Sequence, residues 1–160
     1  MKAQYISLLL ISITLSSCRF SKKETKVNNS GDAFYSDLGG FDRPRIPLIK
    51  PYELLKVSGN EWRLELQNPE LLTLSIHNVK SVAIQDSLIL IYSEGGTEFL
   101  NMQHQKAWFV IEPGVGSEKG FSDEKEFNKV VNRLRGGIKN QFHSLDSLYK
   151  KFEEHKRIVW

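Results

Sequence analysis

The chain has 160 residues, of which 40% are hydrophobic, 26% charged and 11% aromatic, and its 22 basic and 19 acidic residues give a formal net charge of +3. This length is typical of one domain, and the composition disfavours both a disordered chain and a nucleic-acid-binding protein with a dense basic stripe. The single cysteine is Cys18. It excludes an intrachain disulfide framework and a cysteine-rich zinc site built by one chain.

Residues 1–17 have the order of a secretory signal peptide. A single charged residue, Lys2, precedes an apolar stretch over residues 6–15, and this stretch is too short to span a bilayer, which requires about 20 residues. The leader ends in Leu15-Ser16-Ser17-Cys18, which resembles the lipobox of bacterial lipoproteins. The resemblance implies cleavage before Cys18 and attachment of lipid to its sulfur, so the membrane is the first expected partner. A plain signal peptide with an incidental cysteine, or a buried N-terminal strand, is the alternative.

Residues 18–40 are expected to form the lipidated N-terminus and a flexible tether. The segment is polar up to Asp32, and such a composition buries too little apolar surface to offset its ordering entropy. Its net positive charge favours either a solubilising linker or contact with anionic lipid headgroups. Arg19, directly after the cysteine, is compatible with the outer membrane in a cell that has one. We therefore expect a lipid-anchored protein of the cell envelope with a single globular domain over residues 41–160.

The domain is expected to begin at the surface and to continue as short strands. Three prolines, Pro44, Pro47 and Pro51, confine residues 33–51 to the surface or to a sheet edge, because proline lacks the backbone donor that a central strand needs. Strands are predicted next over residues 52–57 and 62–66, separated by a turn at Ser58-Gly59-Asn60.

Alternation of apolar and polar residues predicts which faces of these strands are buried. In residues 62–66 the tryptophan and the leucines share one face, while Arg63 and Glu65 lie on the other. In residues 72–77 the apolar face consists of Leu72, Leu74 and Ile76, and the opposite face carries Thr73, Ser75 and His77.

Two segments, residues 88–92 and 108–111, are apolar on both faces. Such a pattern is typical of central strands covered on two sides. A strand over residues 79–84 and a tight turn at Gln85-Asp86-Ser87 precede the first segment. Something must therefore cover the second face of this sheet, and the C-terminal part of the chain is predicted to supply it.

Two C-terminal helices are predicted from apolar residues at helical spacing. The first begins at an N-cap Ser122 and stops at Gly136-Gly137, and its stripe consists of Phe127, Val130, Val131 and Leu134. The second begins near Asn140, and its stripe consists of Phe142, Leu145, Leu148, Tyr149 and Phe152. The expected fold class is α+β: an antiparallel sheet of about six or seven short strands, followed by two C-terminal helices packed on one face.

Three segments of the domain resemble a family of small bacterial lipoproteins of unknown function. Its members carry a strand pair that turns on an aspartate, then an aromatic-rich strand, then a helix entry that begins with Phe-Ser. Residues 79–92 with Asp86 at the turn, residues 107–112 and residues 121–127 carry these features here. The resemblance covers about a fifth of the chain. It implies a fold and an envelope location, and it carries no catalytic residues.

The motifs for catalysis and metal binding are incomplete in this sequence. Residues 113–120 lie between a predicted strand and a predicted helix, but they lack the spacing of a P-loop or of a dinucleotide-binding fingerprint. A flexible connection is expected there, with Lys119 as the candidate contact for an anion. The histidines are scattered at positions 77, 104, 143 and 155. The sequence therefore predicts no catalytic residue, no cofactor, no cofactor-binding residue and no metal ligand.

The domain is accordingly expected to be a non-catalytic binding or interaction module, with an envelope protein as its candidate partner and no nucleic acid. The alternative is a small envelope hydrolase whose site is assembled only in three dimensions. Convergent titratable groups would favour the enzyme, and an exposed apolar patch would favour the binding module. Trp160 is expected either to tuck into the core or to offer an apolar contact to a partner.

Overall fold

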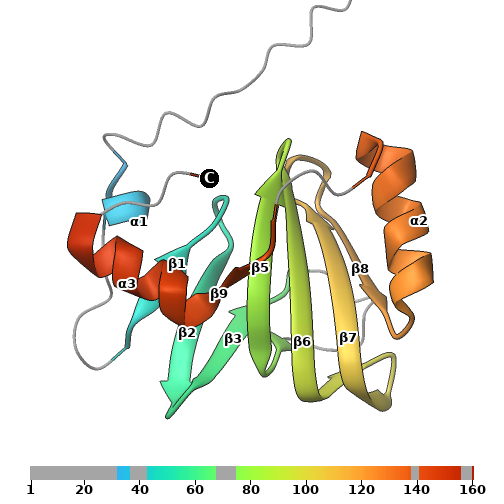
Figure 1. Ribbon diagram of the computed structural model, residues 1–160, viewed down its shortest axis with the longest axis horizontal. Helices are drawn as coiled ribbons and strands as arrows, with labels where there is room; N and C mark the ends of the chain where they lie inside the picture. The colour runs from blue at the N-terminus through green and yellow to red at the C-terminus, as the bar shows by residue number, and fades with distance from the viewer. Residues whose placement is uncertain (1–31, 37–42, 68–74, 138–140, 156–159) are drawn as a thin grey trace, which may run out of the picture.

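The computed structural model describes residues 32–36, 43–67, 75–137, 141–155 and 160. These residues form three α-helices and nine strands, so the predicted α+β class is confirmed (Figure 1). The strands belong to two antiparallel sheets. The expected single sheet of six or seven strands is therefore not confirmed, because alternation within a strand does not reveal which sheet the strand joins.

The first sheet has the order β1-β2-β3-β4 and buries one of its two faces. Its strands are β1 (Arg45–Pro47), β2 (Glu53–Ser58), β3 (Glu61–Glu65) and β4 (Ser75–Ile76). The proline-containing β1 is an edge strand, as predicted. Trp62, Leu64 and Ile76 are buried, so the residues that alternate with them in β3 and β4 face outward.

The second sheet has the order β8-β7-β6-β5-β9 and is buried on both faces at its centre. Its strands are β5 (Val79–Gln85), β6 (Leu88–Phe99), β7 (Met102–Glu112), β8 (Ser117–Phe121) and β9 (His143–Ser144). The predicted central strands over residues 88–92 and 108–111 are confirmed as parts of β6 and β7. The predicted tight turn is also confirmed, with Asp86 and Ser87 at positive φ.

Two apolar clusters fill the interior, one on each face of the second sheet. The larger cluster lies between the two sheets and includes Trp62, Ile91 and Phe109. The smaller cluster joins Leu90 and Val110 of the sheet to Phe127 of α2 (Glu124–Arg135). Because neighbouring residues of a strand point to opposite faces, a run that is apolar at every position supplies both clusters.

The two long helices lie on different sides of the molecule. Figure 1 shows α2 beside β7 and β8, and α3 (Leu145–His155) beside β1, β5 and β9. Leu145 and Leu148 of α3 belong to the cluster between the sheets, whereas Phe127 of α2 belongs to the other cluster. The expected packing of both helices on one face is therefore not confirmed.

Both helices begin later than predicted. The N-cap of α2 is Asp123 rather than Ser122, because the Asp123 side chain accepts hydrogen bonds from the backbone N–H groups of Lys125 and Glu126. The second helix begins at Leu145 and not near Asn140, because His143 and Ser144 pair with β5 as strand β9. Gly136 ends α2 in a left-handed conformation, as predicted.

The connection predicted over residues 113–120 is partly a strand. Pro113–Val115 form a short 3-10 turn, and Ser117–Phe121 pair with β7 as β8. The polar composition of this segment is typical of a loop, but its Glu118 is buried and occupies a core position of the strand. Tertiary pairing therefore overrides the local sequence signal.

A short helix, α1 (Ala33–Ser36), contacts the first sheet. The Arg45 side chain donates a hydrogen bond of 3.2 Å to the Phe34 carbonyl oxygen, and the Lys50 ammonium lies 3.2 Å from an Asp32 carboxylate oxygen. Residues 32–36 were predicted to belong to the tether, but they contact Arg45 of β1 and Lys50, which follows β1 in the chain.

Candidate functional site at the His77 corner

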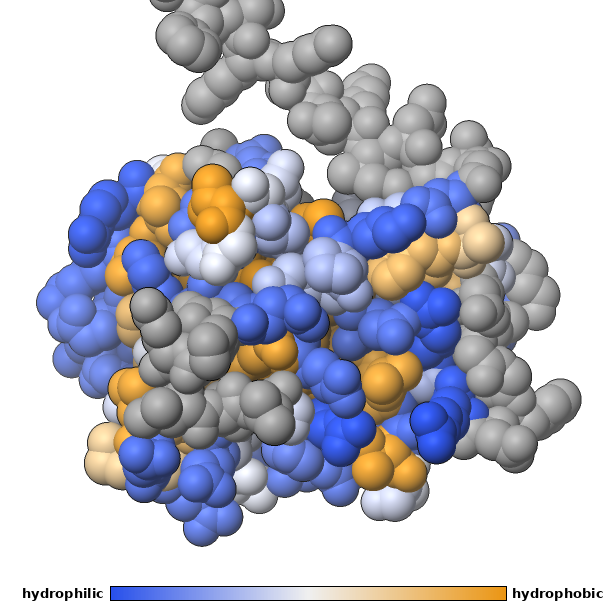
Figure 2. All heavy atoms as spheres, turned by 180° about the vertical axis from the view of Figure 1, so that it is seen from behind, coloured by the Kyte–Doolittle hydropathy of each residue, from blue (hydrophilic) through white to orange (hydrophobic). Residues whose placement is uncertain are grey.

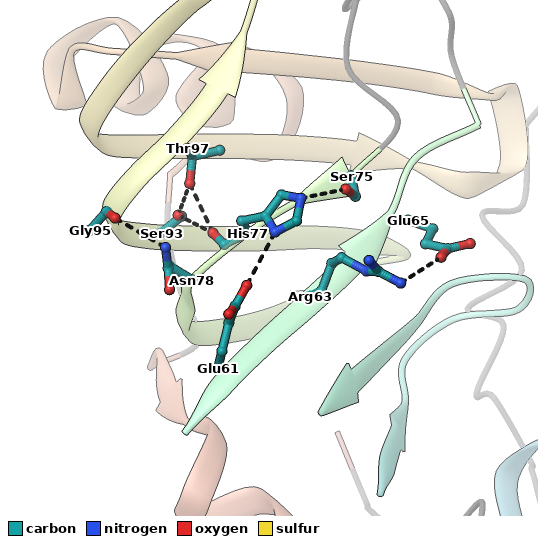
Figure 3. Close-up of polar contacts among 9 residues, drawn as sticks. All are labelled: Glu61, Arg63, Glu65, Ser75, His77, Asn78, Ser93, Gly95 and Thr97. Carbon is teal, nitrogen blue, oxygen red and sulfur yellow. Dashed lines mark hydrogen bonds and ion pairs between the residues drawn. The ribbon is translucent and has the colours of Figure 1, made fainter. Parts of the chain in front are cut away.

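The chain turns between β4 and β5 at a corner that brings three chemically capable side chains together. His77 follows β4 directly, Ser75 lies on β4, and Glu61 lies on the neighbouring strand β3. His77 Nε2 is 2.9 Å from Ser75 Oγ, and His77 Nδ1 is 3.2 Å from Glu61 Oε1 (Figure 3). We call Ser75, His77, Asn78 and Glu61 the His77 corner.

Strand alternation explains why these side chains meet. In the ladder between β3 and β4, Leu64 pairs with Ile76 and both are buried. Ser75 and His77 flank Ile76, so they point to the opposite, outward face together. Glu61 and Arg63 lie on that same face of β3 because they alternate with the buried residues of that strand.

The backbone of His77 is held by two buried hydroxyl groups of β6. Ser93 Oγ donates to the His77 carbonyl oxygen at 2.6 Å, and Thr97 Oγ1 donates to the same oxygen at 2.8 Å. Ser93 and Thr97 are 0% and 1% exposed, and their hydroxyls also contact each other. Buried hydroxyls are costly unless they are bonded. Here that bonding is directed at one carbonyl, that of His77.

A bulge in β6 makes this contact geometrically feasible. The register between β6 and β7 shifts between Glu94 and Thr97, where Gly95 and Gly96 have φ of 114° and 93°. On the opposite side, Asn78 has φ of 52° and donates from Nδ2 to the Gly95 carbonyl oxygen at 3.0 Å. Bulges and left-handed non-glycine residues are frequent beside functional sites. Several such features therefore converge on the backbone of His77.

The side chains of the corner are accessible from solvent. Those of His77 and Glu61 are 43% and 32% exposed. Arg63 and Glu65 extend the polar row along β3, with 3.2 Å between Arg63 Nη2 and Glu65 Oε1. A serine hydroxyl beside an imidazole that is itself bonded to a carboxylate can transfer a proton and expose an oxygen nucleophile.

The hairpin between β6 and β7 forms a second region of interest, the apolar hairpin tip of Leu100 and Met102. Their exposed fractions are 47% and 57%. Leu100 and Asn101 have φ of 52° and 59°, which is unfavourable for a bulky residue such as leucine. The tip follows Thr97 by three residues, or about 10 Å of extended strand. It therefore lies at the same end of β6 as the His77 corner.

On the face shown in Figure 2, the described hydrophobic residues are exposed in separate patches between polar ones. Scattered apolar residues of this kind are normal on a soluble surface and indicate no interface by themselves. The hairpin tip is distinguished by its unfavourable backbone conformation and not by apolar area alone.

The other predicted site residues are dispersed. Cys18 lies outside the described residues, so its lipidation stays a prediction. Lys119 is exposed on β8, and its anion contact also stays a prediction. The His104 ring stacks on Phe99 with 4.2 Å between ring centroids, and His143 is in β9. Trp160 packs against the cluster between the sheets, which favours the first of its two expected roles.

The described part of the chain contains neither a metal-binding cluster nor a membrane-spanning helix. Within residues 32–36, 43–67, 75–137, 141–155 and 160, histidine, cysteine and acidic residues form no group of three or more that would hold a metal ion. In the same part of the chain, no helix has the length and apolar character needed to cross a membrane.

Sequence reasoning missed the site although part of its signal was present. Alternation correctly placed Ser75 and His77 on one outward face, two residues apart. The missing partner was Glu61, because its proximity depends on the pairing of β3 with β4. The two hydroxyls that hold His77 come from a third strand, β6, and no spacing in the sequence connects them to it.

Comparisons with models of protein families, with curated protein sequences and with solved structures gave no match. The geometry of the His77 corner and of the hairpin tip is therefore what supports a function.

Proposed function

We propose that the protein is a lipid-anchored lipoprotein of the cell envelope, located in the outer membrane where the cell has one, whose folded domain acts by binding a partner. The lipobox-like sequence before Cys18 supports the anchor, and the resemblance to small bacterial lipoproteins supports the location. A modified Cys18 would hold the protein almost permanently, because each buried methylene of an acyl chain contributes roughly 0.8 kcal/mol.

One observation carries the binding function: the apolar hairpin tip. A two-residue hairpin turn with positive φ at both positions is strongly preferred by asparagine, aspartate and glycine. This chain has leucine at the first position, exposed, with Met102 exposed beside it. Such a leucine adopts an unfavourable backbone conformation while its side chain stays 47% exposed to water. A contact between the hairpin tip and another protein would bury the Leu100 side chain and offset the cost of its backbone conformation.

Site-specific photo-crosslinking in the native envelope tests this proposal. A crosslinking residue at position 102 of the full, lipidated chain should trap a defined protein species. The matched control is position 57, because Val57 is also exposed, at 49%, near the β2–β3 turn. Equal trapping at the two positions would show that the tip makes no specific contact.

A substitution at position 100 separates binding from folding. Leu100→Asn places a residue that tolerates left-handed φ at the turn, so it should stabilise the domain by up to about 1–2 kcal/mol, the cost of a left-handed L-residue. It should also abolish the crosslink from position 102. A crosslink that survives this variant would contradict the proposed role of Leu100.

A second candidate function is hydrolysis in the envelope. The specific observation that favours it is the contact of His77 with Ser75 on one side and Glu61 on the other. The two functions are compatible, because the hairpin tip and the His77 corner are distinct and lie at the same end of β6.

A further inference from the structure

We infer that the His77 corner is an acyl-transfer site in which Ser75 is the nucleophile, His77 the general base and Glu61 the residue that positions the His77 ring. This inference rests on the second candidate function, hydrolysis, which it makes specific, and it does not depend on the proposed binding function. A serine hydroxyl is a weak nucleophile unless a base lies within hydrogen-bond reach, about 2.6–3.2 Å. The 2.9 Å between Ser75 Oγ and His77 Nε2 meets that requirement.

The second contact of the ring fixes which nitrogen carries the proton. A carboxylate only accepts hydrogen bonds, so at neutral pH the Nδ1–H of His77 donates to Glu61 Oε1, 3.2 Å away. Nε2 is then the nitrogen that accepts the Ser75 hydroxyl proton. A carboxylate in this place also stabilises the imidazolium that forms during reaction, as it does in serine hydrolases of unrelated folds.

The construction of the corner suits a site that must keep its geometry. Ser75 and His77 lie on the same face of one short extended segment, and the hydroxyls of Ser93 and Thr97 hold the His77 carbonyl from behind. A base whose backbone is anchored by buried groups loses little entropy on reaction, and misplacement by about 1 Å can cost about 100-fold in rate. The anchoring groups of β6 are thus positioning residues.

The surroundings indicate the class of substrate. The corner is open to solvent, and Arg63 lies on the same outward face of β3, where it pairs with Glu65. The apolar hairpin tip follows Thr97, which holds the His77 backbone, by three residues, or about 10 Å of extended strand. From the activated serine and this apolar neighbour we assign a carboxylic ester with an apolar portion as the substrate class.

The reaction balances with water as the second reactant. Ser75 Oγ attacks the ester carbonyl carbon while its proton passes to His77 Nε2. The bond from the carbonyl carbon to the alcohol oxygen then breaks, and His77 returns the proton to the departing alcohol. Water next attacks the acyl-Ser75 carbon, giving its proton to His77 as the new bond forms. The Ser75–acyl bond breaks, the proton returns to Ser75 Oγ, and a carboxylic acid leaves.

A fluorophosphonate probe tests the nucleophile directly, because it reacts with activated serine hydroxyls and releases fluoride. The full, lipidated chain in detergent is treated with the probe, and the labelled residue is located by mass spectrometry. We expect label on Ser75, and Ser75→Ala should abolish it. Ser122→Ala is the matched control, because Ser122 is exposed and does not cap α2, and this variant should keep the full labelling rate.

Two further positions test the roles of the partners. His77→Gln should slow labelling at least about 100-fold, the lower end of the usual contribution of a general base. Glu61→Asp should retain more of the rate than Glu61→Gln, although glutamine matches glutamate in size and hydrogen-bonding reach. That order would show that the charge matters and not only the packing. Unchanged thermal unfolding midpoints would show that all variants are folded.

Each remaining outcome overturns the inference. These outcomes are no label on the folded wild-type chain, label on a residue other than Ser75, label on Ser75 that survives His77→Gln, and equal rates in the two Glu61 variants. None of them bears on the crosslink from position 102, since the probe reaction uses the purified chain without a partner. Failure of the acyl-transfer site and failure of the binding function are therefore distinguishable.

Discussion

Two polar networks in this molecule differ in their access to water. In the sealed network, Glu118 accepts hydrogen bonds from the Tyr52 hydroxyl at 2.6 Å and from the Gln67 backbone N–H at 2.8 Å, and both Glu118 and Tyr52 are 3% exposed. In the His77 corner, Ser75 and Glu61 contact the His77 ring, and the side chains are open to solvent. Similar hydrogen bonds are therefore shielded from water in the sealed network and accessible to water in the His77 corner.

The difference follows from desolvation. A buried carboxylate must replace its lost hydration with hydrogen bonds from the protein, and removing one side leaves the other unsatisfied at a cost of about 1–3 kcal/mol for each group. An exposed group exchanges protein partners for water, so exposed pairs contribute about 0–1 kcal/mol. The sealed network therefore holds the two sheets together. The His77 corner is expected to contribute little stability, in keeping with the acyl-transfer role that we infer for it.

The largest expected effect comes from opening the sealed network. Glu118→Ala removes the acceptor of the buried Tyr52 hydroxyl and of the part-buried Gln67 backbone N–H, so it should lower the free energy of unfolding by about 2–5 kcal/mol. Urea denaturation followed by circular dichroism measures the change. Glu94→Ala is the matched control: Glu94 accepts from the Tyr92 hydroxyl at 2.8 Å, but its side chain is 47% exposed. The control should cost no more than about 1 kcal/mol, and equal losses would remove the distinction between the networks.

Thr97 is buried on β6 and holds the backbone of the His77 corner, so its substitution is expected to have an intermediate effect. Thr97→Val keeps the shape of the side chain and deletes one of two donors to the His77 carbonyl. The free energy of unfolding should fall by about 0.5–1.5 kcal/mol, the usual net value of one hydrogen bond. Labelling of Ser75 should slow as well, because the base is less well held. A lower free energy of unfolding without slower labelling of Ser75 would show that the hydrogen bond from Thr97 is structural only.

The buried Tyr52–Glu118 pair and the exposed Tyr92–Glu94 pair can also be compared by their effect on stability at alkaline pH. Burial first, and the bond to Glu118 second, raise the pKa of Tyr52 well above its usual range, while burial and Glu94 raise the pKa of Tyr92 to about 12. A raised folded-state pKa gives stability that is fully present below the unfolded value, about 10, and is lost as the pH rises above it.

Tyr52→Phe should therefore remove part of this alkaline loss. The variant is expected to lose about 1–3 kcal/mol at pH 7, because the buried Glu118 carboxylate loses a donor, and to show a shallower fall in unfolding free energy between about pH 10 and 12. Tyr92→Phe should also flatten the alkaline fall, with a smaller loss at pH 7 because its partner is exposed. Urea titrations at several pH values measure both changes. A pH dependence in Tyr52→Phe as steep as that of the wild type would contradict the assigned cause.

Sequence reasoning predicted the elements of the fold better than their assembly. The runs at residues 88–92 and 108–111 are apolar at every position, so their place in the middle of a covered sheet followed directly. The division into two sheets did not, because each strand of β1 to β4 has the same half-buried pattern that an edge of a single sheet would have. Strand β9 has only two residues and is defined by its partner β5. Strand β8 was hidden because Glu118 is charged, and its burial depends on Tyr52 and Gln67, which flank strands β2 and β3 of the other sheet.

The candidate site was predictable to a similar extent. Local alternation places Ser75 and His77 on one face, since a strand has a period of two. The third member, Glu61, is supplied by the pairing of β3 with β4, and the anchoring hydroxyls are supplied by a bulge in β6. Such contacts join residues far apart in the chain, and one sequence carries no local signal for them.

The free energy of unfolding of His77→Gln tests most directly whether the His77 corner serves chemistry rather than stability. Urea denaturation of this variant should give a value within about 0.5 kcal/mol of the wild type, as expected for an accessible residue whose hydrogen bonds water can replace. A loss of about 2 kcal/mol or more would contradict the account, because it would make the His77 corner a structural tie like that of Glu118.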